Sequence, residues 1–464
     1  MSHRPIIVGG GPAGMAAAIE LAEHNVPSLL FDEASRTGGV VYRGPLRAGV
    51  NLDYLGRRYR KSLHQLHEHF ADCIQWVETR LLSRIVGGDD SRLMALDADE
   101  KLQEVEYKHL LLAAGCHERS VPFPGWTLPG VMLLGGLQLQ IKSGVVKPLG
   151  RTLIAGTGPL LPLVACQLHA AGAEVAGVYE ACAFNRMAKQ SLALMNKPQL
   201  FLQGLSLLAY MKLHGITMHY GWGVVRAEGG AELGEVQLAP YDSQWQADLS
   251  RVRSESVHTL AVGYGFIPRT QLSQQLGLSH AYSDDGYLLA ECNAWQQSST
   301  PHIHVAGDMA GICGGEAGLL TGRIAALSIL QQMGVLDSQQ AQRKRDRYQG
   351  KLANIRRFRA GVERYIARGL LQVELPEADT VICRCEHVTR SAIDLALEQG
   401  VADMASLKMR TRVTMGDCQG RMCVGYCSDR LRIATGQQDV GWLRPRFPID
   451  PIPFAAFENL HKEA

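Results

Sequence analysis

Five of the eleven cysteines lie in one short stretch near the C-terminus, and four of them form two close pairs. Cys383 and Cys385 flank a single residue, whereas Cys418 and Cys423 have four residues between them. Structural zinc sites usually take cysteines as C-x2–4-C pairs, which Cys-x-Cys fits poorly, whereas iron–sulfur clusters are held by four cysteine thiolates. The spacing therefore favours an iron–sulfur cluster, with zinc or free thiols as the alternatives.

The other cysteines show no such pattern. Cys427 is expected to be buried and inert, and the six cysteines before residue 383 are expected to pack in the interior. None of those six forms the Cys-x-x-Cys or Cys-x4-Cys pair that disulfide reductases use. Basic residues near the two pairs would offset the negative charge of a thiolate-ligated cluster; they are Arg384, Lys408, Arg410, Arg412 and Arg421.

A glycine turn near the N-terminus has the features that a dinucleotide requires. It follows an apolar strand at residues 5–8 and opens a helical run at residues 15–24. The first glycine permits the tight turn, the second lets backbone approach a pyrophosphate, and the third lets helix and strand lie close. The turn residues are Gly9, Gly11, Pro12, Ala13 and Gly14. The next strand ends in Asp32, which is expected to bind ribose hydroxyls, with Glu33 as the neighbouring alternative.

NAD and FAD share this turn, and three further segments favour FAD. Gly38-Gly39 follows the acid, as in many two-domain flavoproteins, and a buried strand ends in Ala114-Gly115, which resembles their Ala-Thr-Gly element. A later strand ends in Gly307-Asp308 before a glycine-rich helix start. In the flavoproteins that this segment resembles, the aspartate binds the ribityl chain, and the helix N-terminus stabilises negative charge on the reduced ring.

The same strand, glycine turn, helix and acid recur later in the chain, from Gly156 to Glu180. Two βαβ units predict two doubly wound nucleotide-binding domains. In the second unit Leu161 replaces the third glycine. This domain is therefore expected to keep its fold with lost or weakened nicotinamide binding.

Length and charge narrow the class of protein. The 464 residues suggest about three domains. Lys and Arg number 47 against 45 Asp and Glu, which argues against a nucleic-acid binder driven by bulk charge. The N-terminus has no secretory pattern, so we expect a reducing cytosol. Glycine and proline interrupt the longest uncharged stretches, so no membrane span is expected.

A basic segment precedes the cysteine pairs. Residues 343–370 contain ten Lys or Arg and two acids, and Leu352, Ile355, Val362 and Ile366 fall near one helical face. Such a helix packs on its own protein or lies on an anionic membrane, and the first is favoured here. The expected divisions are an FAD domain at 1–125 and 290–335, a degenerate dinucleotide-binding domain at 126–289, a basic helical linker at 336–375, an iron–sulfur domain at 376–436 and an extended tail at 437–464.

The whole chain resembles the α-subunit family of opine oxidases and hydroxyproline dehydrogenases. Residues 113–131, the degenerate turn at 156–161 and the cysteine pairs carry the resemblance, and the pairs resemble the bacterioferritin-associated-ferredoxin-like [2Fe–2S] domain. It implies an α/β fold with two interleaved Rossmann-like domains, of the pyridine nucleotide-disulfide reductase type, and a small helical [2Fe–2S] domain. Two departures are Ala114 in place of the usual threonine and His117 where arginine is common.

The resemblance also assigns residues to cofactors. For FAD these are Gly9, Gly11, Gly14, Asp32, Gly115, Gly307 and Asp308, and the motifs described above add Pro12, Ala13, Glu33, Gly38, Gly39 and Ala114. For the [2Fe–2S] cluster they are Cys383, Cys385, Cys418 and Cys423. An FMN at an interface with a partner subunit is a further cofactor to consider. No catalytic residue is assigned, because the sequence offers no convincing acid–base pair for amine oxidation.

The implied function is that of a flavin and iron–sulfur electron-transfer subunit in a heteromeric dehydrogenase acting on CH–NH2 groups. Glycine, oxidised to hydrogen cyanide and carbon dioxide, is the expected substrate, and an opine, octopine or D-hydroxyproline is the alternative. The implied partners are a small ferredoxin-like subunit, an amino-acid-oxidase-like FAD subunit and a respiratory-chain acceptor, at the cytoplasmic side of the membrane, with no nucleic acid. A stand-alone NAD(P)H-dependent flavin reductase and a scaffold with vestigial sites are the remaining alternatives.

Overall fold

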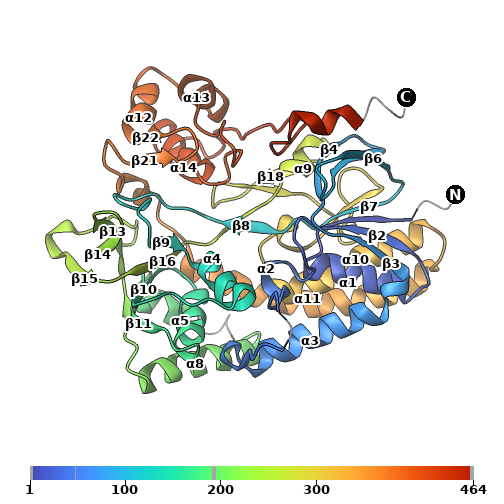
Figure 1. Ribbon diagram of the computed structural model, residues 1–464, viewed down its shortest axis with the longest axis horizontal. Coiled ribbons are helices and arrows are strands. Elements are labelled where there is room, and N and C mark those ends of the chain that lie inside the picture. The colour runs from blue at the N-terminus through green and yellow to red at the C-terminus, as the bar shows by residue number, and fades with distance from the viewer. Residues whose placement is uncertain (1–3, 48, 191–194, 460–464) are drawn as a thin grey trace.

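Two parallel sheets, each packed against helices, carry the two glycine turns (Figure 1). The computed structural model describes residues 4–47, 49–190 and 195–459. The first sheet has the strand order β20-β7-β1-β2-β3, so its edge strand β20 comes from late in the chain. All its neighbouring strands are parallel. These strands are β1 (Ile6–Val8), β2 (Ser28–Phe31), β3 (Val77–Arg80), β7 (Leu110–Leu112) and β20 (Ile303–Val305).

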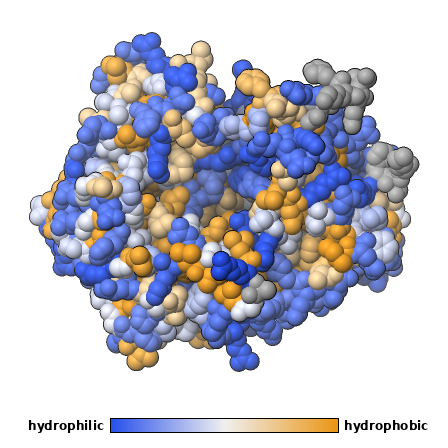
Figure 2. Space-filling model, in the orientation of Figure 1, coloured by the Kyte–Doolittle hydropathy of each residue, from blue (hydrophilic) through white to orange (hydrophobic). Residues whose placement is uncertain are grey.

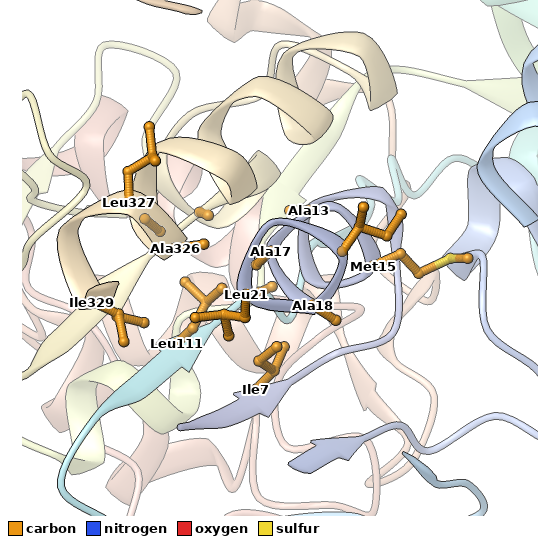
Figure 3. Packing of buried hydrophobic residues seen from close by; sticks show 14 of the residues in the cluster. Ile7, Ala13, Met15, Ala17, Ala18, Leu21, Leu111, Ala326, Leu327 and Ile329 are labelled. Carbon is orange, nitrogen blue, oxygen red and sulfur yellow. The ribbon is translucent and has the colours of Figure 1, made fainter. Parts of the chain in front are cut away.

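Two helices, α1 (Pro12–Ala22) and α10 (Gly315–Gln332), pack against each other on one face of this sheet. Their backbones lie very close, because a Cβ on Gly322 would meet the carbonyl oxygen of Ala13 at 2.0 Å. Figure 3 shows Ile7 and Leu111 of the sheet against Ala17 and Leu21 of α1, with Ala326 and Ile329 of α10 beside them. The late helix α10 thus completes the core that the N-terminal residues begin.

The remaining elements of this half surround the sheet. A three-stranded antiparallel sheet lies beside it, and Ile85 and Leu93 from that sheet share a buried core with Phe31 and Leu112. Its strands are β4 (Arg84–Gly88), β5 (Arg92–Leu96) and β6 (Leu102–Glu106). The helices are α2 (Gly39–Tyr42), α3 (Arg57–Asp72) and α9 (Gln271–Gln275), with the hairpin β18 (His280–Tyr282) and β19 (Leu288–Ala290) and the short turns η1 (Asp53–Leu55), η2 (Ile74–Trp76) and η5 (Gly307–Ala310).

The second sheet, in the order β12-β11-β10-β16-β9, repeats the plan. Its strands are β9 (Val131–Leu133), β10 (Arg151–Gly156), β11 (Glu174–Glu180), β12 (Met218–Tyr220) and β16 (Thr259–Gly263). Its helices are α4 (Leu134–Leu139), the π-helical η3 (Gln140–Gly144), α5 (Leu160–Ala170), α6 (Phe184–Lys189) and α8 (Pro198–Leu213). An antiparallel sheet packs beside it, made of β13 (Trp222–Gly229), β14 (Leu233–Pro240) and β15 (Arg253–Ser256), with the turn η4 (Leu249–Arg251).

One antiparallel pair of strands connects the two halves. The chain leaves the first half through β8 (Cys116–Glu118) and returns through β17 (Phe266–Pro268), which pairs with it. The predicted α/β architecture of two interleaved Rossmann-like domains followed by a C-terminal module is confirmed. Helix α1 begins at Pro12, earlier than the predicted residue 15, because proline is well suited to the first turn of a helix.

The basic segment forms one long helix, α11 (Ser338–Ile366), followed by η6 (Leu370–Glu374). Its predicted apolar face is largely buried, with Leu352 against α10, while Lys344 contacts the fully buried Glu20 of α1 at 3.1 Å. The charged face therefore also binds its own protein. Among the residues that the structure describes, no helix is long and apolar enough to cross a bilayer.

The cysteine module and the tail complete the chain. The module contains β21 (Val381–Cys383), β22 (Val388–Thr389), α12 (Arg390–Glu398), α13 (Met404–Thr411) and α14 (Val424–Thr435). The tail then crosses to the first half and ends in η7 (Phe454–Asn459), so it is not extended throughout, contrary to the expectation from its prolines (Figure 1). Figure 2 shows this face hollowed between the module and the first half, where β17, α13 and the tail line a cavity.

Candidate functional site

The first glycine turn is held so tightly that two of its positions accept no side chain. A Cβ on Gly9 would lie 2.3 Å from the carbonyl oxygen of Ala113, and Gly9 has a φ of 108°. A Cβ on Gly14 would lie 1.9 Å from the carbonyl oxygen of Gly9. By contrast, a Cβ on Gly11 would reach only Gly39 Cα, at 3.8 Å. Gly9 and Gly14 therefore fix the turn, and Gly11 leaves open space in front of it.

Asp32 binds the turn through its own side chain. Its Oδ2 accepts the N–H of Gly10 at 2.6 Å, and its Oδ1 accepts the N–H of Ala34 at 2.7 Å. Burial raises the pKa of Asp32. Each carboxylate oxygen keeps a second lone pair, so this side chain can still accept a hydrogen bond from a ribose hydroxyl.

Glu33, the alternative acid, is engaged differently. Arg269, which follows β17, donates to both of its carboxylate oxygens, at 2.6 and 3.0 Å. These hydrogen bonds are the main reason why the pKa of Glu33 is lowered. Bidentate arginine–carboxylate pairs are among the stronger charge-assisted contacts, so Glu33 serves to hold Arg269 at the site.

One elongated pocket brings the predicted residues together. Its lining includes Gly9, Gly11, Pro12, Ala13, Asp32, Glu33, Gly39, Ala114, Gly115, Gly307 and Asp308. Gly14 and Gly38 do not line the pocket but support the turn that does. Gly14 packs against Gly9, and the N–H of Gly38 donates to the carbonyl oxygen of Gly10 at 2.7 Å. Eleven of the thirteen residues therefore face one space.

Asp308 follows β20, which is separated by β7 and β1 from β2, the strand that leads into Asp32 and Glu33. Its Oδ1 accepts the N–H groups of Cys313 and Gly314, both at 2.9 Å, which fixes the start of α10. Cys116 donates its thiol to the Oδ2 atom at 3.6 Å, and burial raises the pKa of this thiol well above its usual value. Cys116 is therefore a protonated hydrogen-bond donor and not a nucleophile.

The pocket fits a dinucleotide of the FAD type. Neither α1 nor α10 has a side-chain cap at its N-terminus, so both helices present free N–H groups there. A Cβ on Gly115 or Gly314 would meet nothing within 4 Å. Backbone donors thus face open space at two separate points, as a long ligand with phosphates near its middle requires.

The second glycine turn is arranged in the opposite way. Glu180 is fully buried, and its carboxylate accepts the N–H of Gly158 at 2.8 Å and the N–H of Cys182 at 3.0 Å. Burial raises its pKa. Leu161 is fully buried, and Ile366 at the end of α11 lies 3.5 Å from where a Cβ on Gly158 would be. The acid and the turn are therefore bonded to and packed against other parts of the chain, and Ile366 lies next to the turn at Gly158.

The four predicted ligand cysteines lie together in the C-terminal module. Cys383 and Cys423 are buried and interact with each other, whereas Cys385 is exposed and interacts with the half-buried Cys418. Cys427 is buried, as predicted, and contacts Cys423. Within the described ranges, no three His, Cys, Asp or Glu side chains are grouped to hold a single metal ion. Two adjacent thiol pairs, with no imidazole or carboxylate among them, match the donor set of a binuclear iron–sulfur cluster.

Residues after β8 attach both cysteine segments to the stretch of chain that joins the two halves. Ser120 donates its hydroxyl to the carbonyl oxygen of Met422, and Trp126 donates its indole N–H to that of Val381 at 2.7 Å. Arg119, 3% exposed, lies 3.7 Å from Asp429 of α14. The module is therefore docked on the segment that directly follows β8, the strand that begins with Cys116.

Sequence reasoning missed several residues of the pocket wall. Arg269, Arg421, Ile449 and Asp450 all line it, although they come from the segment after β17, the cysteine loop and the tail. The sequence marks Arg421 only as a counter-charge for a cluster. No local pattern marks the other three, because each is brought to the pocket by long-range packing.

Comparison with known proteins agrees with both sites. Residues 3–343 match the pyridine nucleotide-disulphide oxidoreductase family, and residues 381–431 match the BFD-like [2Fe–2S] binding domain. The chain is 72% identical, over the full length of both chains, to hydrogen cyanide synthase subunit HcnB of Pseudomonas aeruginosa. The chain belongs to the family of hydrogen cyanide synthase B subunits.

More distant relatives agree with this family. An opine oxidase subunit of Rhizobium meliloti strain 1021 is 32% identical over 98% of both chains. The crystal structure of L-proline dehydrogenase from P. horikoshii superposes with a TM-score of 0.66 at 19% identity, covering 98% of this chain and 79% of that one, which supports the fold. The predicted likeness to opine oxidase α-subunits is confirmed, and this member of the B-subunit family combines an FAD-type dinucleotide-binding domain with a BFD-like [2Fe–2S] domain.

Proposed function

We propose that the chain is the electron-transfer subunit of a hydrogen cyanide synthase that oxidises glycine. The observation that carries this proposal is that Arg421, which lies between the cysteines Cys418 and Cys423 of the four-cysteine group, also lines the dinucleotide pocket. Oxidation of glycine to hydrogen cyanide and carbon dioxide releases four electrons and four protons. Bound FAD accepts electrons in pairs, and a [2Fe–2S] cluster carries them singly.

The proposed cofactor residues follow from the geometry. The turns ending β1 and β20, together with Asp32 and Asp308, hold FAD through backbone donors and carboxylate acceptors. Cys383, Cys385, Cys418 and Cys423 ligate the cluster. The proposed domain limits are those expected from the sequence: FAD domain 1–125 with 290–335, second domain 126–289, linker 336–375, cluster domain 376–436 and tail 437–464.

We place the chemistry on glycine in a partner protein. The acids of the FAD pocket are occupied by the turn, by Arg269 and by the start of α10. The thiol nearest to the pocket, Cys116, is held protonated. The proposed partners are a small ferredoxin-like subunit, an amino-acid-oxidase-like FAD subunit where the amine is oxidised, and a respiratory acceptor at the cytoplasmic face of the membrane. An FMN at an interface between subunits would connect the two flavin sites.

The decisive test uses the chain purified alone and in its complete complex. We expect flavin and [2Fe–2S] absorption bands in the isolated chain, and cyanide from glycine, but not from an opine or hydroxyproline, in the complex. Zinc without iron in the cysteine module would overturn the electron-transfer role. Cyanide formation at the full rate by a complex containing the cofactor-free chain would instead indicate a scaffold, and rapid flavin bleaching by NADH would indicate a reductase.

A further inference from the structure

The C-terminal tail reaches back to the dinucleotide pocket. Ile449 donates its N–H to the carbonyl oxygen of Val86 at 2.8 Å, which attaches the tail to β4 (Figure 1). Its side chain is 6% exposed and joins the core that contains Phe31 and Ile85. Phe447 lies over Gly87, where a Cβ would come within 2.6 Å of the ring. The tail is therefore packed in place beside the end of β2 that leads into Asp32 and Glu33.

Asp450 meets the cysteine loop at this point. Its Oδ1 lies 2.5 Å from Nη2 of Arg421, and Asp450 is 7% exposed. Arg421 lies between the ligand cysteines Cys418 and Cys423, so a residue of the cluster loop is fixed by a residue of the tail. The Nε atom of Arg421 is buried and has no hydrogen-bond partner. An unpaired buried donor is costly.

Four charged residues with alternating signs surround this end of the pocket. Glu33 is paired with Arg269, Arg269 is stabilised by Asp450, and Asp450 is paired with Arg421. All four line the same pocket, although they come from the turn after β2, the segment after β17, the tail and the cysteine loop. A ligand occupying this end would be enclosed by three parts of the chain besides its Rossmann turn.

We propose that the Arg421–Asp450 pair is a clasp that closes the adenosine end of the dinucleotide site and couples it to the cluster loop. This inference rests on the proposed FAD site. The clasp holds the tail and the loop against the bound ligand. Because binding free energies are reciprocal, a loop ordered by its cluster raises affinity for FAD, and bound FAD raises retention of the cluster.

The first experiment measures FAD affinity of the full chain by fluorescence titration after the flavin has been removed. Asp450→Asn and Arg421→Met should each raise the Kd at least tenfold. The matched controls are Asp439→Asn and Arg444→Met, which change exposed tail charges outside the dinucleotide pocket. A Kd within twofold of the wild-type value in both clasp variants would overturn the inference.

The second experiment tests coupling directly. Removal of iron from the wild-type chain with a chelator should weaken FAD binding, and the same treatment should have little further effect on Asp450→Asn. Equal weakening of FAD binding in both proteins would show that the clasp does not couple the cluster loop to the FAD site, and this result would overturn the inference. If either single variant fails to fold, a chain ending at residue 446 removes the tail side of the clasp, and undiminished FAD affinity in that chain contradicts the proposal.

The results that would contradict the clasp can be distinguished from those that would contradict the proposed FAD site. A wild-type chain that binds no FAD under any condition contradicts the proposed function. A wild-type chain that binds FAD, with clasp variants that bind it equally well, contradicts the clasp alone.

Discussion

The two glycine turns have nearly the same sequence plan and opposite environments. In the first, the acid Asp32 faces a pocket and keeps lone pairs free, and Gly11 leaves space before the turn. In the second, Glu180 accepts the equivalent two N–H groups, but its side chain is fully buried. A βαβ unit therefore specifies a fold, and the open space left before its acid decides whether the unit also binds a ligand.

The third position of each turn explains much of this difference. Gly14 allows α1 to approach β1 until no Cβ fits between them. Leu161 instead fills the interior beneath α5, where it packs with Ile154 and Val178. The end of α11 then covers the second turn from outside, through Ile366. The second domain has replaced ligand contacts with core packing, which stabilises the fold.

The largest expected effect comes from adding one methyl group to the first turn. Gly14→Ala places a Cβ 1.9 Å from the Gly9 oxygen, so α1 must move and the phosphate donors move with it. We expect FAD binding to fall at least a hundredfold, measured from the flavin-to-protein absorbance ratio. The control Gly136→Ala, where a Cβ meets nothing within 4 Å, should bind normally. Normal FAD content in Gly14→Ala would show that the turn does not hold the phosphates.

Restoring the missing glycine tests the second turn. Leu161→Gly should destabilise the protein by about 2–5 kcal/mol or more, since a fully buried leucine is lost. It should not create nicotinamide binding, because Glu180 and Ile366 remain in place. Denaturant unfolding measures the first effect and the rate of flavin bleaching by NADH the second. Fast bleaching in this variant would mean that Leu161 alone blocks the site.

Exchanging the two acids for alanine should separate binding from stability. Glu180→Ala leaves the N–H groups of Gly158 and Cys182 unpaired, which costs about 2–4 kcal/mol, while the FAD Kd stays unchanged. Asp32→Ala also removes the acceptor of the Gly10 and Ala34 N–H groups, but the open pocket lets water replace it, so the main effect should be a rise of about tenfold in the FAD Kd, which corresponds to about 1.4 kcal/mol. Isothermal FAD titration and denaturant midpoints, measured on both variants, give the comparison. Similar profiles for the two variants would remove the distinction drawn between the turns.

A smaller, pH-dependent effect is expected where the chain passes between the halves. Burial raises the pKa of Glu118 to about 6 from 4.5, although the N–H groups of Gly135 and Gly136 donate to it. The folded protein therefore holds this proton more tightly than the unfolded chain does. The resulting contribution to stability is present below pH 4.5 and is lost as the pH rises to 6, by about 2 kcal/mol.

Unfolding curves of the wild type and Glu118→Gln measured across that pH range check this sign. Glutamine cannot titrate, so the difference in stability between the two proteins should change by about 2 kcal/mol when the range is extended from about pH 3 to about pH 8. A difference in stability that is independent of pH would show that the pKa of Glu118 is not raised in the folded protein.

The sequence was most informative where chemistry depends on local spacing. The glycine turns, the acids after β2 and β11, and the cysteine pairs could be identified because each consists of residues close together in the chain. Arg269 and Asp450 could not, because no periodicity relates them to Glu33 or to Arg421, and only packing of the tail on β4 brings them together. The burial of Glu180 was hidden for a similar reason, since it depends on α11.

The position of β20 at the edge of the first sheet has a consequence for how the protein is made. Domains generally fold as units during synthesis, beginning from the N-terminus. Here the first sheet lacks β20 and α10 until residue 332 has left the ribosome, by which time every strand of the second sheet is already available. We therefore expect the second half to fold first on the nascent chain, and FAD to be captured late, after synthesis of α10 and before the tail closes over it.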